Sequence, residues 1–284
     1  MTENNTDFIT YPKTFENYKW YKPILVLIVS IVAYVILIFL LTLVFGFISL
    51  GSYMISPMPL SHEVMADPSR EIFTDLCLFM MVPALYFGSM IVKDRPFSSY
   101  LSTRGKWNYK LYLKAFIIPF IIVLLSALLP FNSQGGVSNF SLLLLIATII
   151  FIPLQCIAEE VIYRGFVMQT FGAWFKIPLA AIILQSVVFT IGHGYNIAGI
   201  SEVFVSGIIY GIFTWKTNGI EVSSAMHTAN NLAVSLFFMF GINGATSSLA
   251  TDIIVAVGLD IVIAAIMYYV GKKTEWFGEI QETS

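Results

Sequence analysis

The sequence predicts an all-α integral membrane protein: a polytopic helical bundle of about eight transmembrane helices with both termini in the cytoplasm. Of its 284 residues, 57% are hydrophobic and 11% are charged, far fewer charges than the roughly 25% of a soluble protein. Residues 23–61, 115–158 and 222–251 contain no Asp, Glu, Lys or Arg. Each of these runs exceeds the ~20 residues that a helix needs to cross a bilayer.

The apolar runs divide into eight expected spans. The run 115–158 is interrupted by the turn-rich residues 131–139, and it therefore holds two spans. The first apolar run is longer than the core of a signal peptide and is followed by no cleavage site, so we expect it to be retained. The spans are expected near residues 24–49, 71–92, 111–130, 140–170, 177–194, 198–215, 220–240 and 251–270.

The basic residues predict the orientation and a single domain. With eight spans, fourteen of the fifteen Lys and Arg fall on the side of both termini, and only Arg70 falls on the other side. Positive charge concentrates on the cytoplasmic side of membrane proteins. We therefore expect residues 1–22 and 272–284 to be cytoplasmic tails. Residues 23–271 would form one transmembrane domain, whose motif-bearing core is residues 140–240.

Two classes of function are excluded by composition. The net charge of −2 leaves no basic face for nucleic acid. Cys77 and Cys156 each lie within an apolar run, 79 positions apart, which is typical of packing residues and not of a disulfide framework or a redox pair. The lipid bilayer is the expected environment.

The densest group of charges inside an expected span is Glu159, Glu160 and Arg164. Ionisable residues in spanning helices are costly, and each is a functional candidate. Glu160 and Arg164 are four residues apart and can pair on one helical face, whereas Glu159 points about 100° away. One carboxylate would be neutralised and the other left available as a general base. Alternatively, the group is an interfacial ion-pair cluster that anchors the helix end.

Two further polar groups follow on later spans. His193 lies four residues after Phe189, and His227 lies four residues before Asn231. If the fourth and fifth spans form a hairpin that turns near Lys176, His193 and Glu159 lie at equal depth. Singly, each histidine is more often a hydrogen-bonded packing residue. Together with the glutamates, the two imidazoles and the amide form a set that can activate water and stabilise an oxyanion.

Read in order, the three groups resemble the signature of the CAAX protease and bacteriocin-processing (Abi) family of intramembrane endopeptidases, similar to type II CAAX prenyl endopeptidases. The family pattern EExxxR, FxxxH and HxxxN is matched without departure at Glu159, Glu160, Arg164, Phe189, His193, His227 and Asn231. The resemblance covers about residues 140–240. It implies an endopeptidase that cuts a membrane-anchored protein or hydrophobic peptide at a site open to the cytoplasm. We expect a multi-pass protein of the bacterial cell membrane.

By this similarity, Glu159 and Glu160 with His193 activate the attacking water, and His227 with Asn231 holds the developing oxyanion. Arg164 orients the glutamate pair and Phe189 supports the site. We expect Glu159 to be the base, because Glu160 has Arg164 four residues away. The cofactor stays open: zinc would accept Glu159, His193 and His227, whereas a metal-free glutamate mechanism is equally consistent with these residues.

Two other functions compete with the protease. A non-catalytic immunity or scaffold protein would keep the same fold, but it has no need of the complete motif set. A secondary transporter would use buried carboxylates as coupling sites, and we find no paired halves with broken helices of the kind that transporters show. Three acidic residues outside the motifs, Glu202, Asp252 and Asp260, are expected to be helix-packing partners. The substrate is not specified by the sequence.

Overall fold

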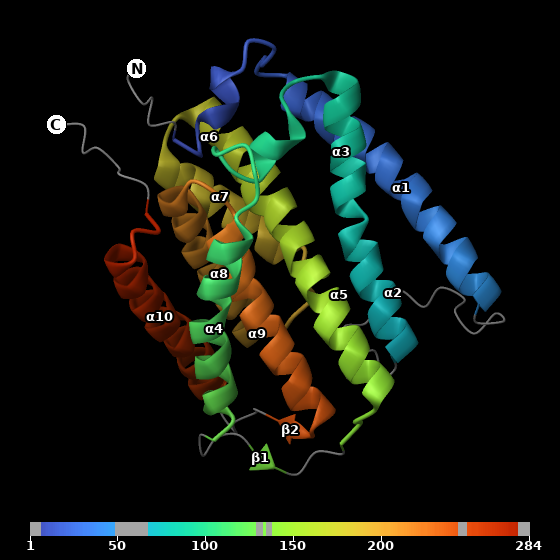
Figure 1. Cartoon of the computed structure of the whole chain (residues 1–284), viewed down its shortest axis with the longest axis vertical. Coiled ribbons are helices and arrows are strands. Elements are labelled where there is room, and N and C mark those ends of the chain that lie inside the picture. The colour runs from blue at the N-terminus through green and yellow to red at the C-terminus, as the bar shows by residue number, and fades with distance from the viewer. Residues whose placement is uncertain (1–6, 49–67, 129–132, 135–137, 244–248, 278–284) are drawn as a thin grey trace.

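The computed structural model describes residues 7–48, 68–128, 133–134, 138–243 and 249–277, and they form a helical bundle (Figure 1). Two short helical turns, η1 (Tyr11–Thr14) and η2 (Phe97–Tyr100), lie outside the long helices. The helices are α1 (Lys22–Ile48), α2 (Pro68–Phe79), α3 (Met81–Val92), α4 (Tyr109–Ser126), α5 (Leu142–Glu160), the π-helix η3 (Val161–Met168), α6 (Gln169–Phe175), α7 (Pro178–Ile191), α8 (Ile197–Thr217), α9 (Glu221–Met239) and α10 (Leu249–Lys273).

The predicted class is confirmed, and a helical segment lies at each of the eight expected positions. Six segments are long and apolar enough to cross a membrane: 22–46, 68–92, 109–126, 142–175, 197–217 and 249–273. α7 is apolar but shorter, and α9 is not among the six. The count of eight spans stays a prediction. The second expected span consists of two helices, α2 and α3, that meet at Met80, and the fourth continues through η3 and α6 to Phe175.

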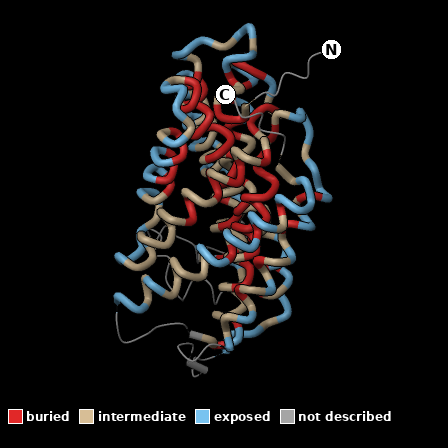
Figure 2. Tube along the Cα trace, turned by 90° about the vertical axis from the view of Figure 1, so that its left-hand side faces the viewer, coloured by how far each residue is buried: buried red, intermediate tan, exposed pale blue. Residues whose placement is uncertain are grey.

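α5 and α9 lie at the centre of the bundle. They contact each other, while α2 packs on α5 and α4 packs on α9. α1 packs on α3 at one flank, α10 packs on α8 and α4 at the other, and α7 packs on α8 (Figure 1). Buried residues are concentrated in this interior, and the outer helices are largely exposed (Figure 2). The motif-bearing helices are therefore the ones that the rest of the bundle covers.

The connecting segments gather at opposite ends of the bundle. At one end, the Phe8 amide donates to Asn218 Oδ1 at 3.3 Å, the Thr103 amide donates to the Asn218 carbonyl at 3.0 Å, and Lys22 Nζ donates to the Lys93 carbonyl at 3.2 Å. At the other end, β1 (Ser133–Gln134) pairs antiparallel with β2 (Ile242–Asn243). The segments predicted to share the positively charged side therefore do meet at one end.

The segment before α1 is packed against this positively charged end. Phe8 and Ile9 are fully buried. Ile9 lies against Gly172 so closely that a Cβ at that position would collide with it. Trp174 Nε1 also donates to the Trp20 carbonyl at 2.8 Å. The N-terminal segment thus fixes α6, the helix that continues the glutamate-bearing helix.

Candidate functional site

Glu160, the last residue of α5, is the centre of the site. Its Oε1 accepts a hydrogen bond from Arg164 Nη1 at 2.8 Å, so the predicted pair four residues apart forms. The same oxygen lies 3.0 Å from His227 Nδ1 on α9. All three side chains are buried. Glu160 therefore joins the first and third sequence motifs through one carboxylate oxygen.

Arg164 is held from several sides within the bundle. It lies in the π-helix η3, a helix form that is often found at functional sites. Its Nη2 donates to the Gly207 carbonyl of α8 at 3.3 Å. Its guanidinium carbon lies 4.4 Å from the centre of the Phe189 ring and 5.3 Å from that of Tyr210. A fully buried cation so enclosed fixes the direction of the Glu160 carboxylate.

Glu159 faces a different environment, as the helical geometry predicts. Its Oε1 accepts from Gln155 Nε2, one turn earlier on α5, at 2.7 Å. Its Oε2 is buried and has no hydrogen-bond partner among the described residues. No ion pair of the described chain involves this carboxylate, in contrast to that of Glu160. The Oε2 atom of Glu160 also has no hydrogen-bond partner among the described residues, so the two glutamates differ in that only Glu160 is paired with a cation.

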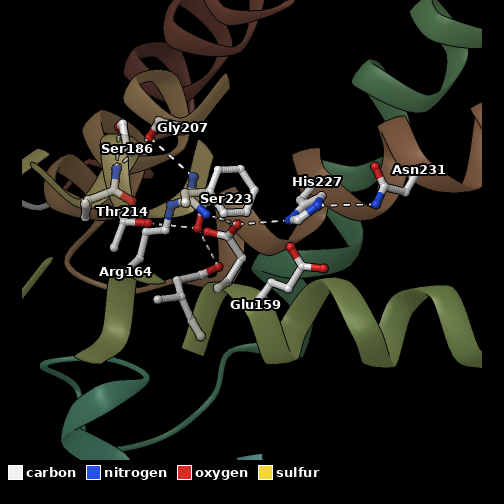
Figure 3. A network of polar contacts seen from close by, with 12 residues as sticks. Glu159, Arg164, Ser186, Gly207, Thr214, Ser223, His227 and Asn231 are labelled. Carbon is white, nitrogen blue, oxygen red and sulfur yellow. Dashed lines mark hydrogen bonds and ion pairs between the residues drawn. The ribbon is translucent and has the colours of Figure 1, made fainter. Parts of the chain in front are cut away.

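His227 presents its second ring nitrogen to Asn231. Because Nδ1 faces Glu160, Nε2 points along α9, where it lies 3.3 Å from Asn231 Nδ2 (Figure 3). The ring stacks on Tyr210 at 5.4 Å and meets the edge of Phe189 at 5.9 Å. A continuous series of polar contacts therefore leads from Arg164 through Glu160 and His227 to Asn231.

His193 lies beyond the end of its helix. α7 ends at Ile191, so the span expected to reach residue 194 is shorter and the histidine sits in the following turn. Its Nδ1 lies 2.8 Å from the Phe189 carbonyl, and its ring packs on the Phe189 ring at 4.7 Å. No hydrogen bond between described residues joins it to either glutamate. The Phe189 ring links His193 to the rest of the site, because it packs against both the His193 ring and the His227 ring.

The hairpin that was expected to align these motifs is present. α6 ends at Phe175, Lys176 takes the left-handed conformation with φ 59°, and α7 begins at Pro178. Tyr163 bridges its two arms: its ring lies 4.8 Å from that of Phe189, and a Cβ at Gly192 would lie 3.0 Å from its hydroxyl. The motifs on the two arms therefore meet through aromatic packing.

Several residues of this site escaped the sequence analysis. Gln155 supports Glu159 from one turn away, a spacing that could have identified it. Tyr210 and the Gly207 carbonyl come from α8, which carries no motif. The thiol of Cys156 lies close to the His227 ring, although the residue packs in the core as expected. Contacts between helices are not visible in spacing along one helix.

The zinc alternative can be compared with the donor atoms. Among the described residues, no three His, Cys, Asp or Glu side chains are grouped closely enough to hold a metal ion. Glu159, His193 and His227 thus do not form a metal centre as they are placed. Both ring nitrogens of His227 already face protein groups.

The acidic residues outside the motifs lie elsewhere in the bundle. Ser206 Oγ on α8 donates to Asp260 Oδ2 on α10 at 2.5 Å, and Glu202 is near enough to Asp260 to interact electrostatically. Asp252 lies in the first turn of α10. Asp260 therefore pairs across helices, as was expected of the packing partners.

A buried polar cluster between α3 and η2 fixes the helix that follows the glutamates. Arg95 lies over the Tyr100 ring at 3.8 Å, donates to the Gly165 carbonyl at 3.5 Å and also bonds Gln169. Tyr100 donates to Asp94 Oδ2 at 3.1 Å. Burial raises the pKa of Asp94 and raises the pKa of Tyr100 to about 12, so the tyrosine stays a donor at neutral pH. This cluster holds η3, and with it Arg164, in place.

Comparisons with known proteins bear on the same region. Residues 139–233 match the family described as type II CAAX prenyl endopeptidase Rce1-like. The protein YyaK of Bacillus subtilis (strain 168), which is described as uncharacterized, is 28% identical over 195 residues. These residues cover 63% of this chain and 64% of YyaK, slightly less than two thirds of the relative's length. No solved structure matches. The matched segment contains all seven motif positions, and over this segment the chain is similar to the Rce1-like family of type II CAAX prenyl endopeptidases.

Proposed function

We propose that the chain is an intramembrane endopeptidase that hydrolyses a peptide bond of a membrane-associated protein or peptide. The observation that carries the proposal is the arrangement of the two glutamates. Glu160 is bonded to Arg164 and His227, while the buried Glu159 beside it forms no ion pair within the described residues. One carboxylate therefore orients the histidine, and the other is available to accept a proton.

Glu159 acts as the general base in this proposal. Its carboxylate takes a proton from a water molecule while the water oxygen bonds to the carbonyl carbon of the substrate. The tetrahedral intermediate then collapses with cleavage of the C–N bond. The proton held on Glu159 passes to the departing nitrogen, which leaves as an amine and returns the carboxylate to its starting state. Gln155 holds Glu159 in position throughout.

His227 and Asn231 supply the oxyanion contacts. The His227 Nε2 and Asn231 Nδ2 atoms lie 3.3 Å apart, so two N–H groups can point to one substrate oxygen when the imidazole is protonated. The Glu160 carboxylate accepts from Nδ1 and directs Nε2 toward Asn231, so the substrate oxygen would be received where these two nitrogens meet. Fixed donors of this kind stabilise the charge that develops in the transition state without reorganisation, and one donor is worth a factor of about 10²–10³ in rate.

His193 assists at the edge of the site. Its Nδ1 donates to the Phe189 carbonyl, which leaves Nε2 as the acceptor. The ring is only half-buried, so it is placed to meet substrate or water that enters beside Phe189. In the proposal it helps Glu159 to orient the attacking water. It does so without a direct bond to the glutamate.

The cellular setting follows from the same reasoning. The basic segments share one end of the bundle, and we propose that this end, with both termini, faces the cytoplasm of a bacterial cell. The site would open toward that side. Substrates compatible with the proposal are prenylated proteins of the CaaX type and precursors of peptides such as bacteriocins, because each presents an extended segment at the membrane.

The test is cleavage of a library of membrane-anchored reporter peptides by the purified protein and by two variants, Glu159→Gln and His193→Ala. We expect Glu159→Gln to lower kcat by about 10²–10⁴-fold, the usual contribution of general base catalysis. The His193→Ala variant should lose activity to a smaller degree. Asp260→Asn is the matched control: it also neutralises a carboxyl group inside the bundle, but a half-buried one that lies between α8 and α10. It should cleave like the parent.

Two outcomes would change the assignment. If Glu159→Gln cleaved normally while folded Glu160→Gln did not, the roles of the two glutamates would be reversed. If neither Glu159→Gln nor His193→Ala altered the biological activity of the protein, the proteolytic function would be refuted and a scaffold or immunity role would remain. Each assay is run with and without a chelator, and loss of cleavage on chelation would establish a metal-dependent reaction.

A further inference from the structure

A pocket of about 510 Å³ opens at the positively charged end of the bundle, between the segment before α1 and the end of α3. Residues 15–17 form one wall, and residues 94–97 form another. The last turns of α3, with Tyr86, Ser89 and Met90, complete it. Its volume lies within the range of about 300–1,000 Å³ that is typical of small-molecule sites. These residues carry none of the three motifs and lie outside the segment that matches the family.

The pocket lies at the level where the headgroups of a bilayer are expected. α1 begins at Lys22 and α3 ends at Val92, and both helices belong to segments that are long and apolar enough to cross a membrane. Lys22 Nζ donates to the carbonyl of Lys93, so the two helix ends lie side by side. The end of a spanning segment marks the border between the hydrocarbon core and the headgroups. An amphiphilic ligand therefore fits here, with its polar part at the end of the bundle and its apolar part along α3.

One side of the pocket is apolar and continues along the outer face of α3. Tyr86 and Met90 are four residues apart, so they share a helical face, and they are 46% and 47% exposed. The Phe97 ring lies 5.5 Å from the Tyr86 ring and extends this wall. Lipid tails are as apolar as the side chains that a spanning helix exposes to them. A hydrocarbon chain can therefore lie against Tyr86 and Met90 while the group at its end enters the pocket.

The other side of the pocket carries charges of both signs. Asp94 and Arg95 are buried and pair with each other, with Arg95 Nε 3.5 Å from Asp94 Oδ2. Lys93 and Glu16 are exposed, and neither forms an ion pair with another described residue. One positive and one negative side chain thus face the pocket without a protein partner of opposite charge. A ligand with one anionic and one cationic group matches both, whereas a purely anionic headgroup would be repelled by Glu16.

We propose that this pocket binds one phospholipid of the bilayer whose headgroup is zwitterionic and of the ethanolamine type. Its phosphate pairs with Lys93, and its ammonium pairs with Glu16. One acyl chain follows the exposed face formed by Tyr86 and Met90. A primary ammonium donates three hydrogen bonds, and the side chains of Glu16 and Asn17 offer acceptor oxygens, whereas a choline headgroup has no N–H to donate. The proposal does not depend on whether the chain is a protease.

Native mass spectrometry of the purified, delipidated full-length protein tests the proposal without any substrate. The protein is titrated with phosphatidylethanolamine, phosphatidylcholine and phosphatidylglycerol that carry the same acyl chains. We expect one bound phosphatidylethanolamine, with a Kd about threefold to tenfold lower than that of the other two lipids, the contribution of one hydrogen bond or exposed ion pair. Phosphoethanolamine, the headgroup without chains, should not displace the lipid at equal concentration, because it lacks the apolar contact.

Two variants separate a specific site from nonspecific association of lipid. Lys93→Gln should weaken the binding of phosphatidylethanolamine by about threefold to fivefold. Glu16→Lys should shift the preference to phosphatidylglycerol, because two lysines then face the phosphate of an anionic lipid. Lys110→Gln is the matched control: it removes an exposed lysine at the start of α4, outside the pocket, and should bind like the parent. Equal affinity of the parent for the three lipids, unchanged binding in Lys93→Gln, an unchanged preference in Glu16→Lys, or displacement by phosphoethanolamine would overturn the proposal.

Discussion

α1 and α9 differ in the way that distinguishes a lipid-facing helix from an interior one. α1 is apolar on all sides, and large side chains such as Val32 and Val35 are 57% and 61% exposed. α9 carries Ser223, Ser224, His227 and Thr228, and all of them are buried. In water the apolar helix would be the buried one. In a bilayer the order is reversed, because lipid is as apolar as the side chains that face it, and polar groups find partners only inside the protein.

This contrast also explains which helix holds the chemistry. α1 meets its neighbour α3 through Gly88, where the helices approach closely. α9 meets α5 and α4 through hydrogen bonds, including the His227–Glu160 contact and the bond from the Tyr112 hydroxyl to Thr228 Oγ1 at 3.0 Å. The close contact at Gly88 leaves no room for large polar side chains between the helices. A hydrogen-bonded interior, in contrast, can keep a carboxylate and an imidazole in fixed positions.

Removal of the Glu160 charge should have the largest effect on the interior helices. Glu160→Gln leaves the fully buried Arg164 without its carboxylate, and breaking a buried pair costs about 3–5 kcal/mol. Thermal unfolding in detergent measures the loss. The control is the double variant Glu160→Leu with Arg164→Leu, which removes both charges. If the single variant were as stable as the parent, the packing of α5 against α9 would not depend on the Glu160–Arg164 pair.

A larger side chain at the contact of α1 with α3 should have an intermediate effect. A Cβ at Gly88 would collide with Ser30 and lie 2.8 Å from the Val26 carbonyl, so Gly88→Val should separate the helices at a cost of about 1–3 kcal/mol. Gly46→Val, on α1 with no atom within 4 Å, is the matched control and should be nearly neutral. Reporter cleavage by folded Gly88→Val should persist, because the site lies between α5 and α9. Equal loss of stability in both glycine variants would show that α1 does not pack specifically.

The helical segments could be predicted from the sequence because the bilayer imposes a length and a composition. The charge-free run that begins at Pro23 corresponds to α1, and the hairpin near Lys176 lies between the expected fourth and fifth spans. The break at Met80 and the end of α7 at Ile191 were not anticipated. Both concern where a helix stops inside an apolar run, and that depends on contacts with neighbouring helices.

The site was predictable where its contacts follow one helix. Glu160 with Arg164, and His227 with Asn231, are pairs at a spacing of four residues, and both are in contact. The bond between Glu160 and His227 joins residues 67 positions apart on different helices, so spacing along one helix does not predict it. The direct approach of His193 to Glu159 was expected from equal depth alone. Depth does not determine the rotation of a helix, and Phe189 fills the space between the motifs.

The smallest expected effects come from isosteric exchanges that reverse the polarity of one side chain on each helix. Thr228→Val leaves the Tyr112 hydroxyl without its partner in the interior and should cost about 0.5–1.5 kcal/mol. Val35→Thr places a hydroxyl on the exposed face of α1, where it can bond to the carbonyl one turn earlier, and it should cost less than about 0.5 kcal/mol. Unfolding of both variants in one detergent gives the two values side by side. A greater loss for Val35→Thr than for Thr228→Val would mean that α1 packs against protein and that its exposed face is not a lipid-facing surface.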